Sequence, residues 1–165
     1  MLDIDNIYPD DSGLAFDNMI EGMDSLFIVK SENIRKLADQ LATYHNFTGR
    51  VAYHWDDNSG IKRFDLQHII LPKTERLIDA LYHIGNMPHF GIFLFTGFGN
   101  QLEAPMMKNV IEHFIESTAQ HRKFILFADS NPKIPNDLKD KFQTLTINQT
   151  YSSCESAIRT RYLPS

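Results

Sequence analysis

The chain has 165 residues, of which 42% are hydrophobic and 22% are charged, and its formal net charge at pH 7 is −5. These values predict a single domain over residues 1–165, large enough to bury a core of its own. The acidic balance argues against a general nucleic-acid binder, which normally presents a basic face.

The single cysteine, Cys154, excludes an internal disulfide and a cysteine-rich zinc site, and it fits the reducing cytoplasm. No apolar run approaches the roughly 20 residues that span a bilayer. The N-terminus is acidic and lacks the basic start and apolar core of a signal peptide. We therefore expect a cytoplasmic protein without membrane contact.

The predicted core of the domain covers residues 24–148, between an N-terminal extension (1–23) and a polar C-terminal tail (149–165). The extension contains a turn at Asp10-Asp11-Ser12-Gly13, and residues 14–23 are expected to form a short helix.

The first strand and helix of the core meet without a phosphate loop. A buried strand is predicted at 26–29, and apolar side chains at helical spacing predict a helix at 34–44. Nucleotide-binding α/β domains carry glycines and a lysine at this junction, whereas the chain has Lys30-Ser31-Glu32-Asn33. Glu32 would repel an anion in the first turn, so we favour Ser31 as the helix N-cap and Glu32 as a partner of the helix dipole.

The rest of the chain continues to alternate strands and helices. Further strands are expected at 50–55, 90–98, 124–128 and 144–147, and further helices at 77–84, 105–115 and 136–142. Thr74 can cap the helix at 77–84. Residues 61–66 either return as a hairpin strand or form an irregular connection. The nearly continuous apolar run at 90–98 is typical of a central parallel strand that is covered on both faces.

Strands that alternate with helices imply right-handed crossovers and an open parallel sheet. We therefore predict a three-layer α/β/α fold with a mostly parallel sheet of about five strands. The predicted architecture is a degenerate RecA-like, P-loop-like fold from which the P-loop is missing.

Several of these residues also occur in the pattern of a known family. The matching positions are Glu32, Arg35, Trp55, Gly60, 91–98, 124–128, Ile134, Pro135 and Leu138. On them, residues 24–148 resemble the N-terminal, non-ATPase domain of the AAA ATPases found as an open reading frame in cyanobacteria and algal plastids. The resemblance implies a RecA-like sheet whose nucleotide site has decayed, and it implies no defined activity. The chain departs from the family pattern in one respect, because no AAA module follows within these 165 residues. If the chain is this domain, we expect it to stand alone.

Candidate ligand-binding residues follow the predicted strands, because ligands of open α/β sheets gather beyond the carboxyl ends of the strands. They are Lys30, Ser31, Thr96, Asp129 and Ser130. An NTPase carries an acidic pair near the position of Thr96, and a threonine cannot replace a carboxylate as a magnesium ligand. Asp129 is followed by Asn131 and Pro132, and an ordinary turn is the favoured interpretation of that segment.

Neither metal binding nor covalent catalysis is indicated by the sequence. The seven histidines form no HxxxH or HExxH pair, and His45 and His113 are expected on helix surfaces. Cys154 has no evident partner base. We predict no catalytic residues, no metal and no cofactor.

Two functions stay open, and a third is disfavoured. The preferred one is a non-enzymatic interaction module, a pseudo-ATPase-like adaptor or regulatory subunit that binds a protein partner or itself. Its docking candidates are Phe47, Phe64, Met87, Met106 and the acidic segment from Asp3 to Asp11. The alternative is a small-molecule or nucleotide-binding domain that uses the strand-end residues. Nucleic-acid binding would need Lys30, Arg35, Lys36, Lys62 and Arg63 on one face.

Overall fold

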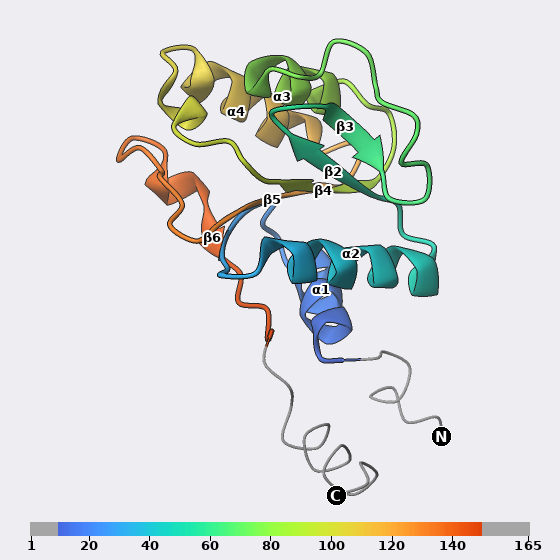
Figure 1. Cartoon of the computed structure of the whole chain (residues 1–165). Coiled ribbons are helices and arrows are strands. Elements are labelled where there is room, and N and C mark those ends of the chain that lie inside the picture. The colour runs from blue at the N-terminus through green and yellow to red at the C-terminus, as the bar shows by residue number, and fades with distance from the viewer. Residues whose placement is uncertain (1–9, 150–165) are drawn as a thin grey trace, which may run out of the picture.

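Residues 10–149, which the computed structural model describes, form a six-stranded sheet with helices on both of its faces (Figure 1). The strands are β1 (Leu26–Lys30), β2 (Ala52–Asp56), β3 (Gly60–Arg63), β4 (Gly91–Phe95), β5 (Lys123–Asp129) and β6 (Gln143–Thr144). The helices are α1 (Ser12–Glu21), α2 (Ile34–Thr48), α3 (Leu77–Gly85) and α4 (Met107–Ser117).

The strand order is β3-β2-β4-β5-β1-β6. Every neighbouring pair is parallel except β2 and β3, which form an antiparallel hairpin. The three-layer, mostly parallel fold predicted from the sequence is therefore confirmed, and the hairpin alternative for residues 61–66 is the correct one.

Two helices cover each face of the sheet. α1 and α2 lie on one face, and α3 and α4 lie on the other (Figure 1). The alternation of side chains along β2 divides its residues between the two cores: Ala52 packs with α1 and α2, whereas Tyr53 and Trp55 pack with α3 and α4. The sheet therefore separates two distinct apolar clusters.

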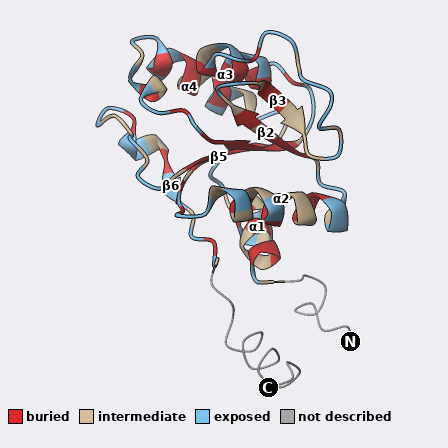
Figure 2. Ribbon diagram, in the orientation of Figure 1, coloured by how far each residue is buried: buried red, intermediate tan, exposed pale blue. Residues whose placement is uncertain are grey.

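The centre of the sheet is the most deeply buried part of the molecule. All five residues of β4 are buried, as are the first six of β5, and Figure 2 shows both strands in red between the helical layers. This burial explains why the apolar run at 90–98 does not alternate: both of its faces need hydrophobic side chains.

Two predicted helix caps are wrong. Asn33, not Ser31, caps α2, because its side chain accepts a hydrogen bond from the Lys36 amide at 3.0 Å. α3 has no side-chain cap. The Thr74 hydroxyl instead accepts a hydrogen bond from the Ile61 amide at 3.0 Å and donates one to the Leu71 carbonyl at 2.7 Å.

Some predicted boundaries also change. The helix expected at 136–142 is only a short 3-10 turn at Lys139–Lys141, and none of the three residues of this turn is buried. The last strand is limited to Gln143–Thr144, and α4 begins at Met107 rather than at Pro105.

The short helix predicted near the N-terminus is present as α1, and Phe16 from α1 is fully buried in the cluster that it shares with α2. The tail from residue 150 onward lies outside the described residues. None of the helices within residues 10–149 is long and apolar enough to cross a membrane.

Candidate functional site

The candidate ligand-binding residues all lie at the carboxyl ends of β1, β4 and β5, but they do not converge on one point. Lys30 and Asp129 are opposite each other in the β1–β5 ladder. By the alternation of these strands, both belong to the face covered by α3 and α4. Ser31 and Thr96 instead contact groups on the face of α1 and α2, as described below. Ser130 is exposed.

Ser31 is occupied by a contact within the chain. It is 4% exposed, and its hydroxyl donates a hydrogen bond to the side-chain oxygen of Gln149. The same hydroxyl accepts a bond from the Asn33 amide at 3.1 Å. Ser31 therefore fixes the segment after β6 against the start of α2.

Gln149 covers the N-terminal turn of α2, where a phosphate would bind in a P-loop protein. Its side-chain nitrogen donates to the Asn33 carbonyl at 3.0 Å, and its carbonyl accepts a bond from the Lys36 ammonium. Gln40 adds a bond to the Asn148 carbonyl at 3.1 Å. Since the Lys36 amide is also bonded to Asn33, this turn presents an internal hydrogen-bond network in place of an open anion site.

Thr96 is paired with a histidine that the sequence did not single out. His54 Nε2 lies 2.7 Å from the Thr96 hydroxyl, and the His54 ring stacks on Phe64 at 5.9 Å. Burial lowers the pKa of His54. Alternation along β2 is enough to predict that His54 points to the opposite face of the sheet from Tyr53 and Trp55. Its contact with Thr96 could not be predicted, because the sequence does not show that β2 and β4 are neighbours in the sheet.

The segment after β5 is a turn, as the sequence favoured. The Asp129 carboxylate accepts a hydrogen bond from the Asn131 amide at 3.1 Å, and the Asp129 carbonyl accepts one from the Ser31 amide at 3.0 Å. None of the five candidate side chains lines any of the hollows discussed next.

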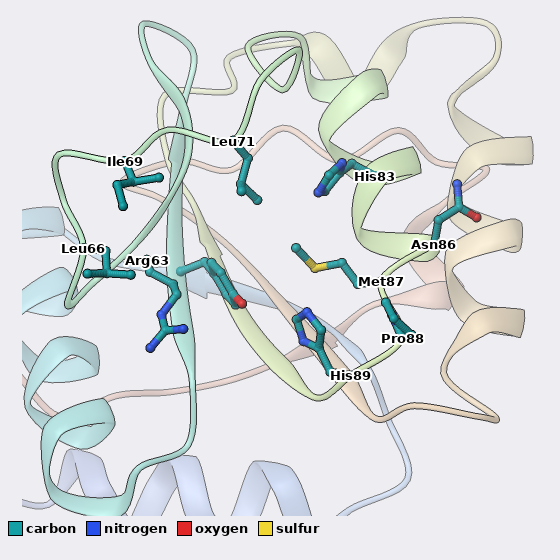
Figure 3. Close-up of a pocket in the computed structure, with 10 residues that line it drawn as sticks. Arg63, Leu66, Ile69, Leu71, His83, Asn86, Met87, Pro88 and His89 are labelled. Atoms are coloured by element: carbon teal, nitrogen blue, oxygen red, sulfur yellow. The ribbon is translucent and has the colours of Figure 1, made fainter.

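The best-formed pocket lies at the opposite end of the parallel strands, near the amino ends of β2 and β4. Its volume is about 470 Å³. In Figure 3 the segment with Leu66, Ile69 and Leu71 forms one wall, and the end of α3 with the residues that follow forms the other. The lining residues are Tyr53, Arg63, Leu66, Ile69, Leu71, His83, Asn86, Met87, Pro88 and His89.

The sequence carries one signal for this pocket. The segment from Leu66 to Leu71 contains four large aliphatic residues but has the periodicity of neither a helix nor a strand. In the structure an isolated bridge between Lys62 and Ile70 and a hydrogen bond from the Leu71 amide to the Ile61 carbonyl hold it beside β3.

The docking candidates named from the sequence have different surroundings. Phe47 and Met106 are 55% and 62% exposed. Phe64 packs partly against the core of α1 and α2, and Met87 is buried in the wall of the pocket. Of the acidic segment, the part from Asp3 to Pro9 lies outside the described residues.

Two histidines differ from expectation. His45 is buried rather than on the helix surface, because its Nδ1 accepts a hydrogen bond from the Ala52 amide at 2.9 Å and its Nε2 lies 3.4 Å from Asp65. His113 is half-buried and stacks on Tyr82 at 5.1 Å. Within residues 10–149, no three His, Cys, Asp or Glu side chains are grouped so that they could hold a metal ion.

The basic residues that a nucleic-acid interface would need are on separate elements. Lys30 ends β1 and Lys62 lies on β3, and three strands separate β1 from β3 in the sheet. Arg63 is paired with Asp65 at 2.7 Å, and Lys36 is bonded to Gln149.

A family model matches most of the chain. The model for the SpoVK-like AAA ATPase N-terminal domain covers residues 15–147, from the first turn of α1 to just beyond β6. The match confirms the resemblance to an AAA ATPase N-terminal domain and extends it to α1. No curated protein and no solved structure matches the chain.

Proposed function

We propose that this chain, which belongs to the family of SpoVK-like AAA ATPase N-terminal domains, acts as a non-enzymatic protein-interaction module. In this proposal it serves as an adaptor or regulatory subunit and binds no nucleotide. The observation that carries the proposal is the contact between Ser31 and Gln149 at the start of α2.

Nucleotide hydrolysis requires groups that bind the phosphates and groups that hold magnesium. At the position where the phosphates would bind, Gln149 makes hydrogen bonds with the Asn33 carbonyl, the Lys36 ammonium and the Ser31 hydroxyl. At the end of β4, where an NTPase would hold magnesium, the Thr96 hydroxyl is hydrogen-bonded to His54. Both features support a binding role over a catalytic one.

The exposed residues near the pocket, at the amino ends of the strands, support the proposal of a protein partner. Ile69 and Ile70 are 49% and 44% exposed beside the pocket, and Tyr82 on α3 is 54% exposed. Exposed apolar side chains around a hollow are typical of protein interfaces. In this proposal the carboxyl ends of the strands resemble those of an NTPase, whereas the partner protein binds near the amino ends.

Thermal unfolding with and without nucleotide tests this function. A ligand at 100 times its dissociation constant stabilises the folded state by about 2.7 kcal/mol, which would raise the melting temperature of this domain by a few degrees. We expect no shift with magnesium and millimolar ATP, ADP or GTP. A shift that disappears in Lys36→Met would contradict the proposal and favour the alternative, a nucleotide site at the carboxyl ends of the strands.

A further inference from the structure

The pocket at the amino ends of β2 and β4 has the size and lining of a binding site. Its volume of about 470 Å³ lies within the roughly 300–1,000 Å³ of ligand pockets. Leu66, Ile69, Leu71, Met87 and Pro88 supply apolar walls. An apolar side chain from a partner would bury its surface here.

One polar group in the pocket lining is the Tyr53 hydroxyl. Tyr53 is 6% exposed, and its ring stacks on Phe93 with 4.7 Å between the centroids. No hydrogen bond joins the Tyr53 hydroxyl to another group within residues 10–149, and the hydroxyl oxygen is not one of the fully buried atoms without a partner. Because Tyr53 lines the pocket, its hydroxyl can donate a hydrogen bond to a ligand there.

The polar rim of the pocket favours an acidic ligand. Arg63, His83 and His89 line it, and no carboxylate does, although the whole chain is acidic. Arg63 binds Asp65 through Nε and Nη2, so its Nη1 is left to donate elsewhere. An adjoining hollow of about 450 Å³ shares Tyr53, Arg63 and His89 with the pocket and adds Arg50, again without a carboxylate in its lining.

The pocket and its neighbouring hollows together offer more space than one side chain would fill. A third hollow of about 650 Å³ beside α3 shares His83 and Asn86 with the pocket. Its lining is mixed in charge, with Lys73 and Arg76 beside Glu75 and Asp79, so the excess of basic residues lies in the other two hollows. Because the pocket shares lining residues with both neighbouring hollows, we treat the three as one trench from Gly49, past the pocket, to Lys73. An extended chain with side chains at regular intervals fits such a series of hollows better than one compact small molecule does.

We propose that this trench binds an extended acidic segment of a partner protein, which inserts an apolar side chain into the pocket and places a neighbouring carboxylate near Tyr53 and Arg63. The proposal rests on the function proposed above and adds the place and the chemistry of the partner. In Figure 3 the rings of His83 and His89 point into the space that the apolar side chain would fill.

Fluorescence anisotropy with two labelled hexapeptides tests it on the full chain. Both peptides carry Leu-Phe at the centre, flanked by two glutamates on each side in one and by two lysines in the other. We expect the glutamate peptide to bind at least roughly tenfold more tightly, with a difference that shrinks as salt is added. Equal binding of the two peptides, or no binding of either, would overturn the proposal.

Three variants locate the bound peptide. Ile69→Glu places a carboxylate at the exposed rim and should weaken binding of the glutamate peptide by about tenfold or more. Tyr53→Phe keeps the stacked ring, removes only the hydroxyl and should weaken it by roughly threefold to tenfold. Met106→Glu makes the same change as Ile69→Glu at an exposed site that lines none of the three hollows, and should leave binding unchanged.

Two results would assign the trench differently. If Ile69→Glu and Met106→Glu bind the peptide equally, the peptide binds elsewhere and the proposed site is wrong. If the chain self-associates in sedimentation and Ile69→Glu abolishes this, a second copy occupies the trench in place of an acidic segment. Either result overturns this inference without contradicting a non-enzymatic module, which the nucleotide test addresses separately.

Discussion

Gly60 and Thr74 form the joint that holds the pocket wall over the sheet. The Thr74 hydroxyl bonds the Ile61 amide and the Leu71 carbonyl, and the Thr74 carbonyl accepts a hydrogen bond from the Trp55 indole at 2.6 Å. Gly60 has a φ of 81°, and a Cβ at this position would lie 2.6 Å from the Thr74 hydroxyl oxygen. Ile61 and Thr74 are 13 residues apart in the chain, so local sequence patterns do not reveal this joint.

Gly60→Ala should therefore destabilise the fold. The left-handed conformation alone costs roughly 1–2 kcal/mol for a residue with a Cβ. The contact with Thr74 adds to this cost, whereas Gly99, at a φ of 53°, has no atom within 4 Å of an added Cβ. Urea denaturation should show a larger loss in the free energy of unfolding for Gly60→Ala than for Gly99→Ala. Equal losses would show that the joint is not tightly packed.

Tyr44 is a second residue whose environment has a measurable consequence. Its hydroxyl donates to Asp17 at 2.6 Å and accepts a hydrogen bond from Arg50, which also binds Asp17 at 2.7 Å. Burial, together with the hydrogen bond to Asp17, raises the pKa of the Tyr44 phenol above its ordinary value of 10.0.

This raised pKa predicts alkaline destabilisation. Above pH 10 the unfolded phenol loses its proton while the folded one keeps it, so the free energy of unfolding falls as the pH rises. Tyr44→Phe is expected to be less stable than the natural chain at neutral pH because it loses two hydrogen bonds, but its stability should decline less steeply above pH 10. Urea midpoints measured on both sides of pH 10 test this, and parallel declines of the two proteins would refute it.

At the scale of elements, the start of α2 shows where local sequence patterns stop being decisive. Ser31 and Asn33 are both good N-cap residues two positions apart, and pattern alone cannot choose between them. The choice was made by Gln149, which engages Ser31 from a distant part of the chain. In contrast, β4 and β5 were predictable because two-sided burial leaves a continuous apolar run.

Substitutions at Asn33 test the assignment of the cap. Asn33→Ala should lower the free energy of unfolding by about 1 kcal/mol, the usual cost of losing an N-cap. Asn33→Asp keeps an oxygen for the Lys36 amide and should be as stable as the natural chain or more so, because a carboxylate favours the helix dipole. Chemical denaturation of the two variants decides, and an unchanged stability in Asn33→Ala would contradict the assignment.

For the whole molecule, the proposal assigns different roles to the two ends of the parallel strands. The carboxyl ends of the parallel strands resemble those of a nucleotide-binding fold, but the Ser31 and Thr96 side chains there are engaged by contacts within the chain. The pocket that Tyr53 lines lies near the amino ends of β2 and β4. The fold class could be predicted from the alternation of strands and helices, and the positions of the candidate residues could be predicted from the ends of the strands. The pocket could not be predicted, because its walls come from an irregular segment and from the end of α3, which meet only in the folded chain.

The most direct test of this division is a map of amide chemical shifts in the isotope-labelled full chain, titrated separately with Mg-ADP and with the glutamate peptide. The account predicts that the peptide shifts the signals of residues 66–71 and 83–89, while Mg-ADP leaves those of residues 30–36 unchanged. Saturable shifts of residues 30–36 with Mg-ADP, combined with none at the pocket with the peptide, would contradict it.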